Sequence, residues 1–435
     1  MTDPNEQFVV VIKEDDAADL RKSLLQTHSD DGFLSSRTSD TKHGTSFART
    51  CLNLSNAISG IGVLSLPYAL SLGGWLSLAI FVLVSSICYY TGLLIQRCMD
   101  ADPCIKTYPD IGEYAFGRKG KLVISIFMYL ELYLVAVGFL IMEGDNLDKL
   151  FPGVCLKFAS VSVQGKQLFI LLSALVILPT TWPRNLGILA YVSAGGVLAS
   201  AVLLGSLLWA GIVDTGFHEK GRILDLNGLP TAMGLFFMCF TCHAVFPTIS
   251  SSMRDSTRFP KVVSISFVLC TINYALMAIL GYLMYGEKLE SQVTLNLPAG
   301  EPYTRIAIYT TLINPITKFA LAMSPISGAI EQQLALCRGR MPGKMPSLLI
   351  RTLLLCGTVV IALAIPFFAY LMAFVGSFLS VVVSVLFPCV CYLKIHGVSQ
   401  VRRLELVNIL GIVVVGSLVA VIGTYSSLRD IICNR

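Results

Sequence analysis

Three ionisable side chains stand inside long apolar stretches of the sequence, where charge is costly. They are Glu131, His243 and Lys318. A charged group at the centre of a bilayer costs at least about 2.5–3.5 kcal/mol, so such residues usually face a cavity or a partner. Burial favours the neutral form of a carboxyl, and histidine titrates near physiological pH. We therefore expect these three residues to relay protons or to couple an ion to another process.

Two of the apolar stretches are interrupted by small and polar residues. The first contains Asn56 and Ser59–Val63 and is followed by Pro67, while the second contains Phe240–His243 and is followed by Pro247. In a helix, glycine costs about 1 kcal/mol and proline about 3 kcal/mol relative to alanine. An uninterrupted apolar helix would not normally gather such residues. The pattern therefore predicts two helices that are broken near mid-membrane.

Broken helices of this kind can bind a small zwitterion such as an α-amino acid. Unwound backbone at membrane depth is tolerated only where it is buried in protein or lines a cavity. The free N–H groups at the start of one half-helix suit a carboxylate, and the carbonyls at the end of another suit an ammonium. The residues predicted to bind this substrate lie at the two breaks: Asn56, Ser59, Gly60, Ile61, Gly62, Val63, Phe240, Thr241 and His243.

Each of these assignments has a structural alternative. Glycines also let neighbouring helices pack closely in a membrane, although two breaks at matching places favour a cavity. His243 could be a hydrogen-bonded structural residue, and Lys318 could pair with a backbone carbonyl or with Glu131. Cys239, Cys242 and His243 match the C-x-x-C-H pattern of haem attachment. The match falls inside an apolar stretch, so it predicts no haem.

The elements that hold these residues must be membrane helices. Of the 435 residues, 54% are hydrophobic and 14% are charged, and the mean hydropathy is +0.72. Soluble proteins carry about 25% charged residues. The apolar residues also come in blocks, which excludes an ordinary water-soluble enzyme. The formal net charge of +5 is too small to indicate nucleic-acid binding.

Composition divides the chain into two parts. Residues 1–45 are polar and are predicted to form a disordered tail, whereas residues 46–435 are predicted to form one all-α transmembrane domain. The domain contains about eleven apolar stretches of membrane-spanning length: Phe47–Leu72, Trp75–Leu94, Lys121–Met142, Gln167–Trp182, Ile188–Val213, Leu229–Ser250, Val262–Tyr285, Thr304–Gln332, Ser347–Phe367, Ala369–Leu393 and Leu406–Tyr425.

Lysines and arginines predict the orientation, because cytosolic loops carry an excess of them. Loops on the side of the N-terminal tail carry 15, and the opposite loops carry 7. We therefore expect a cytosolic N-terminus and, with an odd number of spans, a lumenal or extracellular C-terminus. Between the second and third spans, Tyr108–Gly117 is predicted to form either a short cytosolic helix that starts at Pro109 and Asp110 or a plain connector.

Six segments, spread from about Thr45 to the C-terminus, carry a family resemblance: Asn56–Leu70, Gly73–Trp75, Tyr108–Glu113, Glu131–Tyr133, Cys242–Pro247 and Asn314–Lys318. The chain resembles the amino acid/auxin permeases, which belong with the LeuT-like transporters, and among them the plant vacuolar amino-acid transporters. The resemblance implies a ten-helix core built as a five-plus-five inverted repeat, one peripheral helix, amino-acid substrates and proton coupling. LeuT-like transporters often bind sodium between the first and eighth helices. Lys318 would place a fixed ammonium there and favour protons.

The sequence therefore predicts a secondary active transporter that exchanges neutral amino acids for protons at the vacuole. Its expected partners are the amino acid, protons and the lipid bilayer. No P-loop, G-x-G-x-x-G motif, catalytic pair or set of metal ligands is evident, so we expect no enzyme activity, cofactor or metal. Two other functions stay open: proton- or sodium-coupled uptake at the plasma membrane, and amino-acid sensing through the Ser- and Thr-rich tail. The sequence does not indicate an oligomeric state.

Overall fold

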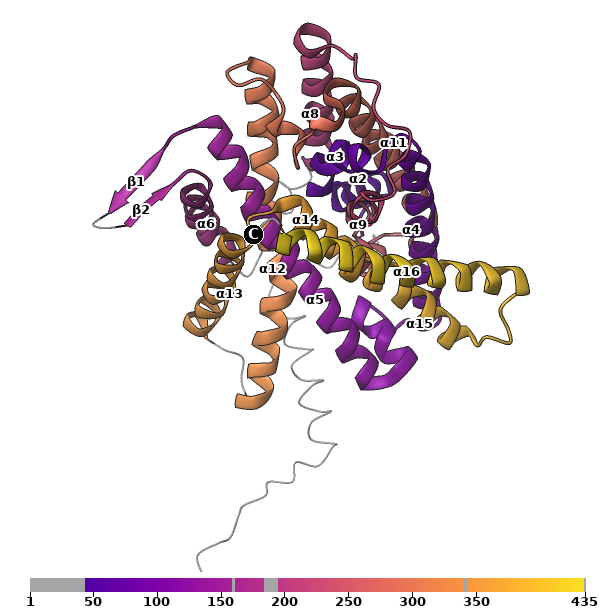
Figure 1. The fold of residues 1–435 in the computed structure, drawn as a ribbon. Coiled ribbons are helices and arrows are strands. Elements are labelled where there is room, and N and C mark those ends of the chain that lie inside the picture. The colour runs from indigo at the N-terminus through magenta and orange to yellow at the C-terminus, as the bar shows by residue number, and fades with distance from the viewer. Residues whose placement is uncertain (1–43, 159–160, 184–194, 340–342, 434–435) are drawn as a thin grey trace, which may run out of the picture. The chain divides into compact units, whose positions relative to one another are not determined.

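Helices make up most of the structure (Figure 1). The computed structural model describes residues 44–158, 161–183, 195–339 and 343–433. The α-helices, in chain order, are α2 (Phe47–Ile58), α3 (Leu66–Gly73), α4 (Ser77–Asp100), α5 (Tyr108–Leu150), α6 (Lys166–Thr181), α8 (Gly196–Ala210), α9 (Leu229–Cys239), α10 (Phe246–Ser251), α11 (Phe259–Tyr285), α12 (Pro302–Arg338), α13 (Lys344–Ala364), α14 (Phe368–Phe374), α15 (Phe387–His396) and α16 (Arg403–Cys433). Shorter turns of 3-10 or π-helix used below are η1 (Ile61–Ser65), η3 (His243–Val245), η6 (Val293–Leu295), η7 (Val375–Ser380) and η8 (Val382–Leu386).

Membrane-length helices confirm the predicted all-α membrane fold. Within the described ranges, nine helices are long and apolar enough to cross a bilayer, and the bent pair of α2 with η1–α3 would make ten. Helix α6 is apolar, but with 16 residues it is too short to be counted among these nine helices. Residues 188–194 of the predicted fifth span lie outside the described residues, as do residues 1–43 of the predicted tail. The total of eleven spans and the disordered tail stay predictions.

The two interrupted helices lie at the centre of the bundle. Helix α11 packs along α2 and α3, and α9 packs against α3 and η7. Helix α12 packs along α5 and α8, and α6 lies beside α13 (Figure 1). The contact between α9 and η7 is unusually close, since a Cβ on Gly376 would lie 1.8 Å from the carbonyl oxygen of Gly234. Glycine at position 376 therefore allows the two backbones to touch.

A β-hairpin adds a small departure from the helical pattern. Strands β1 (Cys155–Phe158) and β2 (Val161–Gln164) pair antiparallel between α5 and α6 (Figure 1). We call this side of the bundle, where α5 ends and α6 begins, the hairpin end. The opposite side, where α2 begins and Thr45 pairs with Met253, is called the tail end.

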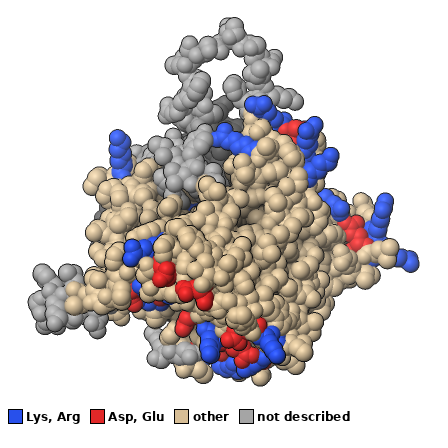
Figure 2. All heavy atoms as spheres, turned by 90° about the horizontal axis from the view of Figure 1, so that it is seen from above, with Lys and Arg blue, Asp and Glu red and all other residues tan. Residues whose placement is uncertain are grey.

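The outer faces of several spans are apolar and exposed. On α16, for example, Val407 is 68% exposed and Val421 is 71% exposed. Figure 2, a view from above relative to Figure 1, shows a face on which most atoms belong to uncharged residues and the Lys, Arg, Asp and Glu side chains gather in a few patches. An apolar exterior of this kind is compatible with surrounding lipid.

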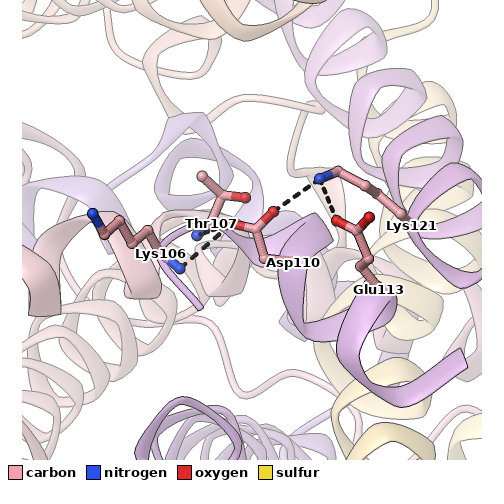
Figure 3. Close-up of polar contacts among 5 residues, drawn as sticks. All are labelled: Lys106, Thr107, Asp110, Glu113 and Lys121. Atoms are coloured by element: carbon pink, nitrogen blue, oxygen red, sulfur yellow. Dashed lines mark hydrogen bonds and ion pairs between the residues drawn. The ribbon is translucent and has the colours of Figure 1, made fainter. Parts of the chain in front are cut away.

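The segment that begins α5 forms a short helix, as one of the two sequence interpretations predicted. Thr107 caps it, and Asp110 completes the capping box by accepting a hydrogen bond from the Thr107 N–H at 2.9 Å (Figure 3). The Lys121 ammonium lies 3.1 Å from Asp110 and 2.6 Å from Glu113. Gly117 separates this segment from the rest of α5 with a φ of 69°, a left-handed conformation that favours glycine.

A buried ion pair joins α12 and α13 at the tail end. Arg351 and Glu331 are 8% and 5% exposed, and their N–O distance is 3.2 Å. Ser347 donates a further hydrogen bond to the Glu331 carboxylate at 2.5 Å. The Arg351 guanidinium also donates to the carbonyl of Thr181 at 3.1 Å, so it caps the last turn of α6.

Candidate functional site

The first predicted break is present in the structure. Helix α2 ends at Ile58, Ser59 and Gly60 follow, and η1 leads into α3 at a bend of 49°. Gly62 is held against the second interrupted helix, because a Cβ at this position would lie 2.7 Å from the Cys239 sulfur and 3.1 Å from the Cys239 Cα. The small residues of the first break therefore allow two interrupted helices to meet.

The second predicted break is also present. Helix α9 ends at Cys239, and η3 and α10 follow after Phe240–Cys242. Phe240 is fully buried and stacks on Phe267 with the ring centroids 5.7 Å apart. Its edge faces Tyr274, whose hydroxyl donates to the carbonyl of Ile58 at 2.7 Å. An aromatic cluster on α11 thus connects the second break to the end of α2.

A small cavity lies beside the first break. Its volume of about 20 Å³ is enough for one water molecule, so an amino acid would need the surrounding helices to separate. The walls come from the break itself and from α5, α8 and α12: Ser59, Gly60, Ile61, Val63, Leu64, Phe139, Met142, Ala199, Ser200, Leu203, Thr310, Thr311, Asn314 and Lys318. The wall is apolar where α5 contributes Phe139 and Met142, and polar along α12.

The predicted binding residues divide into two groups around this cavity. Ser59, Gly60, Ile61 and Val63 line it, together with Lys318. The remaining residues lie behind the wall or at the second break: Asn56, Gly62, Phe240, Thr241 and His243. The cavity is therefore formed mainly by the first break and by helices that the prediction of binding residues did not include.

Lys318 connects α12 to the end of α2. Its ammonium donates to the carbonyl oxygens of Asn56 at 3.1 Å and Ser59 at 2.5 Å. A cation at this end of a helix is favourable, because the last carbonyls have no partner inside the helix. The geometry agrees with both sequence interpretations of Lys318, as a lysine bonded to carbonyls and as an ammonium fixed between the first and eighth spans. The ion pairs of the described residues do not include one between Lys318 and Glu131.

Glu131 belongs to a polar chain that crosses three elements. The side chain is 1% exposed and forms a hydrogen bond with Ser380 of η7. The Ser380 hydroxyl accepts in turn from the Thr241 hydroxyl at 2.6 Å. The chain of Glu131, Ser380 and Thr241 thus joins α5 to the second break. Sequence reasoning missed Ser380, although a serine inside an apolar span is the signal that would have found it.

His243 points toward α4 and lies outside the cavity wall. Its Nε2 lies 2.9 Å from the carbonyl oxygen of Cys88 and 3.1 Å from the Thr91 hydroxyl. A carbonyl only accepts, so the proton is assigned to Nε2. The ring also stacks on Phe246 at 5.0 Å. This is the arrangement of the structural alternative, in which His243 fixes the second break to α4.

Neither break offers a metal site in the described part of the chain. No three His, Cys, Asp or Glu residues there are grouped so that they could hold a metal ion. Cys239 and Cys242 are both buried, and no disulfide joins them. The chemistry available at the breaks is therefore hydrogen bonding by backbone and hydroxyl groups, together with the charges of Glu131 and Lys318.

Comparison with known proteins supports a transporter. The family model described as transmembrane amino acid transporter protein matches residues 43–429. The chain is 50% identical over 399 residues to amino acid transporter AVT1I of Arabidopsis thaliana, covering 90% of this chain and 97% of the relative. It is 48% identical over 390 residues to amino acid transporter AVT1J of the same plant, covering 89% and 92%.

A solved structure shows the same fold at low sequence identity. It is a mutant form of the manganese transporter of Eremococcus coleocola, with a TM-score of 0.53 and 15% identity over 92% of this chain and 90% of the other. A likeness at this identity concerns the fold alone. It agrees with the LeuT-like architecture that was expected from the sequence.

Proposed function

The chain belongs to the family of transmembrane amino acid transporter proteins, and from that premise we propose that it is a secondary active transporter that exchanges neutral amino acids for protons across the vacuolar membrane. It is a multi-pass membrane protein of a transporter family and not an enzyme. The observation that carries the proposal is the contact between two interrupted helices, Gly62 against Cys239, beside a cavity at mid-helix.

The substrate site is proposed at the first break. The first N–H groups of η1 have no earlier turn to bond to, so they suit the substrate carboxylate. The backbone carbonyls of the second break, at Phe240 and Thr241, suit the ammonium, because the Ser59 carbonyl already accepts from Lys318. Phe139 and Met142 form an apolar wall and carry no charge, which favours a neutral side chain over an ionised one. Binding requires the cavity to widen, and in transporters of this kind that widening accompanies alternating access.

Proton coupling is assigned to Glu131. A neutral Glu131 can donate its proton to the Ser380 hydroxyl, whereas an ionised Glu131 can only accept. Ser380 also accepts from Thr241 at the second break. Protonation therefore reverses the direction of the first hydrogen bond in a chain that ends at the proposed site. Lys318 supplies a fixed positive charge between α2 and α12, where a sodium ion would otherwise be needed.

The proposal also includes the orientation of the chain in the vacuolar membrane and the direction of transport. The excess of Lys and Arg in loops on the side of the tail supports a cytosolic N-terminus. With lumenal protons moving out, amino acids would move from the cytosol into the vacuole.

Flux into proteoliposomes tests the proposal. The full chain is reconstituted, and uptake of labelled L-alanine is compared with that of labelled L-lysine, with an imposed pH gradient and with or without sodium. We expect alanine uptake that follows the pH gradient and ignores sodium. Uptake that ignores the pH gradient would overturn proton coupling, a requirement for sodium would favour the alternative of sodium-driven uptake, and alanine binding without flux would favour a sensor.

A further inference from the structure

A second carboxyl is buried in α5 and has no part in the mechanism above. Glu143 is 2% exposed, and its Oε1 atom has no hydrogen-bond partner among the described residues. The side chain is not in the wall of the cavity. It lies one residue beyond the predicted third span, Lys121–Met142, on the part of α5 that leads to the hairpin end.

Among the residues that the structure describes, no basic side chain forms an ion pair with Glu143. The elements that pack against α5 include α6, α12 and α13. Their buried or partly buried basic side chains are engaged elsewhere: Lys166 with Asp145 at 2.5 Å, Lys318 with the carbonyls of α2, and Arg351 with Glu331. Lys149, on α5 itself, donates to the carbonyl of Leu295 at 2.5 Å.

Electrostatics then decides the protonation state. An ionised carboxylate without a partner is far costlier to bury than a neutral carboxylic acid. A buried carboxyl without a partner therefore binds a proton and is neutral, which avoids the free-energy cost of burying a charge. A neutral acid also brings a donor, and an acceptor without a partner is available one helical turn away: the Oδ1 atom of Asn146, which is fully buried.

A ladder of polar side chains leads from this turn to the hairpin end. Asn146 donates to the Gln292 side chain at 2.6 Å, and Gln292 donates to Asp145 at 2.8 Å. Asp145 lines an open pocket at the hairpin end, which it shares with Asp148, Lys149, Glu290 and Leu295. A proton that enters from this end therefore meets hydrogen-bonding groups up to the turn that follows Glu143.

Glu143 lies beyond the cavity from Glu131. The two carboxyls are twelve residues apart on α5, which places them about 18 Å apart along the helix axis. Phe139 and Met142, which form the apolar wall of the cavity, lie between them in the sequence. One acid thus adjoins the second break, and the other lies toward the hairpin end.

We propose that Glu143 is a second proton-binding site of this transporter, which exchanges its proton with the hairpin end of the bundle. Its part in transport rests on the proton coupling proposed above, whereas the bound proton itself does not. Proton binding is a simple transfer: the proton adds to the carboxylate from water and returns to water on release, so no other reactant is needed.

Infrared spectroscopy tests the bound proton directly. The C=O stretch of protonated carboxyls is recorded at neutral pH on the purified full chain in lipid, for the wild type, Glu143→Gln and the control Glu290→Gln. Glu290 is exposed to solvent, so it shows whether a loss of the band is specific to the buried acid. We expect Glu143→Gln to remove one component of the band and Glu290→Gln to remove none. A band unchanged by Glu143→Gln would overturn the proposal.

Flux measurements test whether the proton bound to Glu143 takes part in transport, which the infrared band alone does not show. In proteoliposomes, Glu143→Gln should keep alanine counterflow, which needs no net proton movement, and lose most of the alanine accumulation that a pH gradient drives. Equal accumulation in the variant and the wild type would show a structural proton and overturn the role in coupling. Failure of the wild type to respond to a pH gradient would instead count against the proposed function and leave the infrared result standing.

Discussion

The Lys318 ammonium lies 2.5 Å from the carbonyl oxygen of Ser59, so a cation of α12 closes the broken end of α2. The same ammonium also bonds to the carbonyl of Asn56 one turn earlier. A single lysine thus holds two elements that alternating access would have to move relative to each other.

Lys318→Ala should change the ion dependence of transport. Hydrogen bonds from a charged group contribute about 1.5–3 kcal/mol each, and their loss leaves two carbonyls that a cation from solution can bind. We expect alanine uptake by the variant to become sodium-dependent or to fall at least tenfold. Uptake in proteoliposomes with and without sodium measures this, with the exposed Lys261 mutated to Ala as the control. Unchanged proton coupling in Lys318→Ala would remove Lys318 from the mechanism.

Glu131→Gln should abolish the response of uptake to pH. In the exchange proposed above, the protons that bind Glu131 come from the side of the membrane to which the amino acid is delivered. Wild-type uptake should therefore rise as the pH on that side falls. Glutamine cannot take up the proton, so alanine uptake by the variant, measured in proteoliposomes over a series of pH values, should not change with pH. Alanine counterflow by the variant should persist.

Ser380→Ala should weaken the same response, because it removes the link between Glu131 and Thr241. The matched control is Ser377→Ala on the same π-helical turn, since the Ser377 hydroxyl donates to the carbonyl of Phe374, the residue just before that turn, at 3.4 Å. Uptake measured over a series of pH values compares the two. Equal curves for both serine variants would contradict a relay through Ser380.

Gly62→Ala should disable transport through a steric clash. The added methyl would lie 2.7 Å from the Cys239 sulfur, and such overpacking costs typically about 1–3 kcal/mol. Combining it with Cys239→Ala removes the sulfur and should restore part of the alanine uptake and of the thermal stability. Lack of any rescue by Cys239→Ala would show that the contact between the two breaks is not what Gly62 provides.

Arg351→Met should destabilise the protein by about 3–5 kcal/mol, because it removes the guanidinium from the buried Glu331 carboxylate. The double variant Arg351→Met with Glu331→Met removes both charges and should be more stable than Arg351→Met alone. Thermal unfolding of the purified proteins in detergent measures both. A double variant that is less stable than either single variant would argue against a cost of unpaired charge.

The breaks could be predicted because their signals are local. Glycine and proline disfavour the interior of a helix, and proline is accepted in its first turn, so Gly60, Gly62, Pro67 and Pro247 identify the two interrupted helices from the sequence alone. The spans could be found in the same way, since a run of about twenty apolar residues is itself the signal. These features depend on residue type and neighbours in the chain, and not on how the helices pack.

The sequence does not predict which side chains contact each other across the bundle. Glu131 and Ser380 are 249 positions apart, and nothing in either segment specifies the other. The orientation of His243 depends on which helix lies beside the second break, and the structure places α4 there through Cys88 and Thr91. Contacts of this kind follow from the packing of whole helices. The second break therefore contributes less to the cavity wall than its composition suggested.

The continuity of α5 after Gly117 has a mechanical consequence. From there to Leu150 the helix runs for about 50 Å without a further non-helical residue. One stiff rod carries Glu131, the apolar wall at Phe139 and Glu143, so a small rotation about its axis would turn all three at once. The motion of this one helix would then couple proton binding to substrate binding, and no conformational change in the loops would be needed.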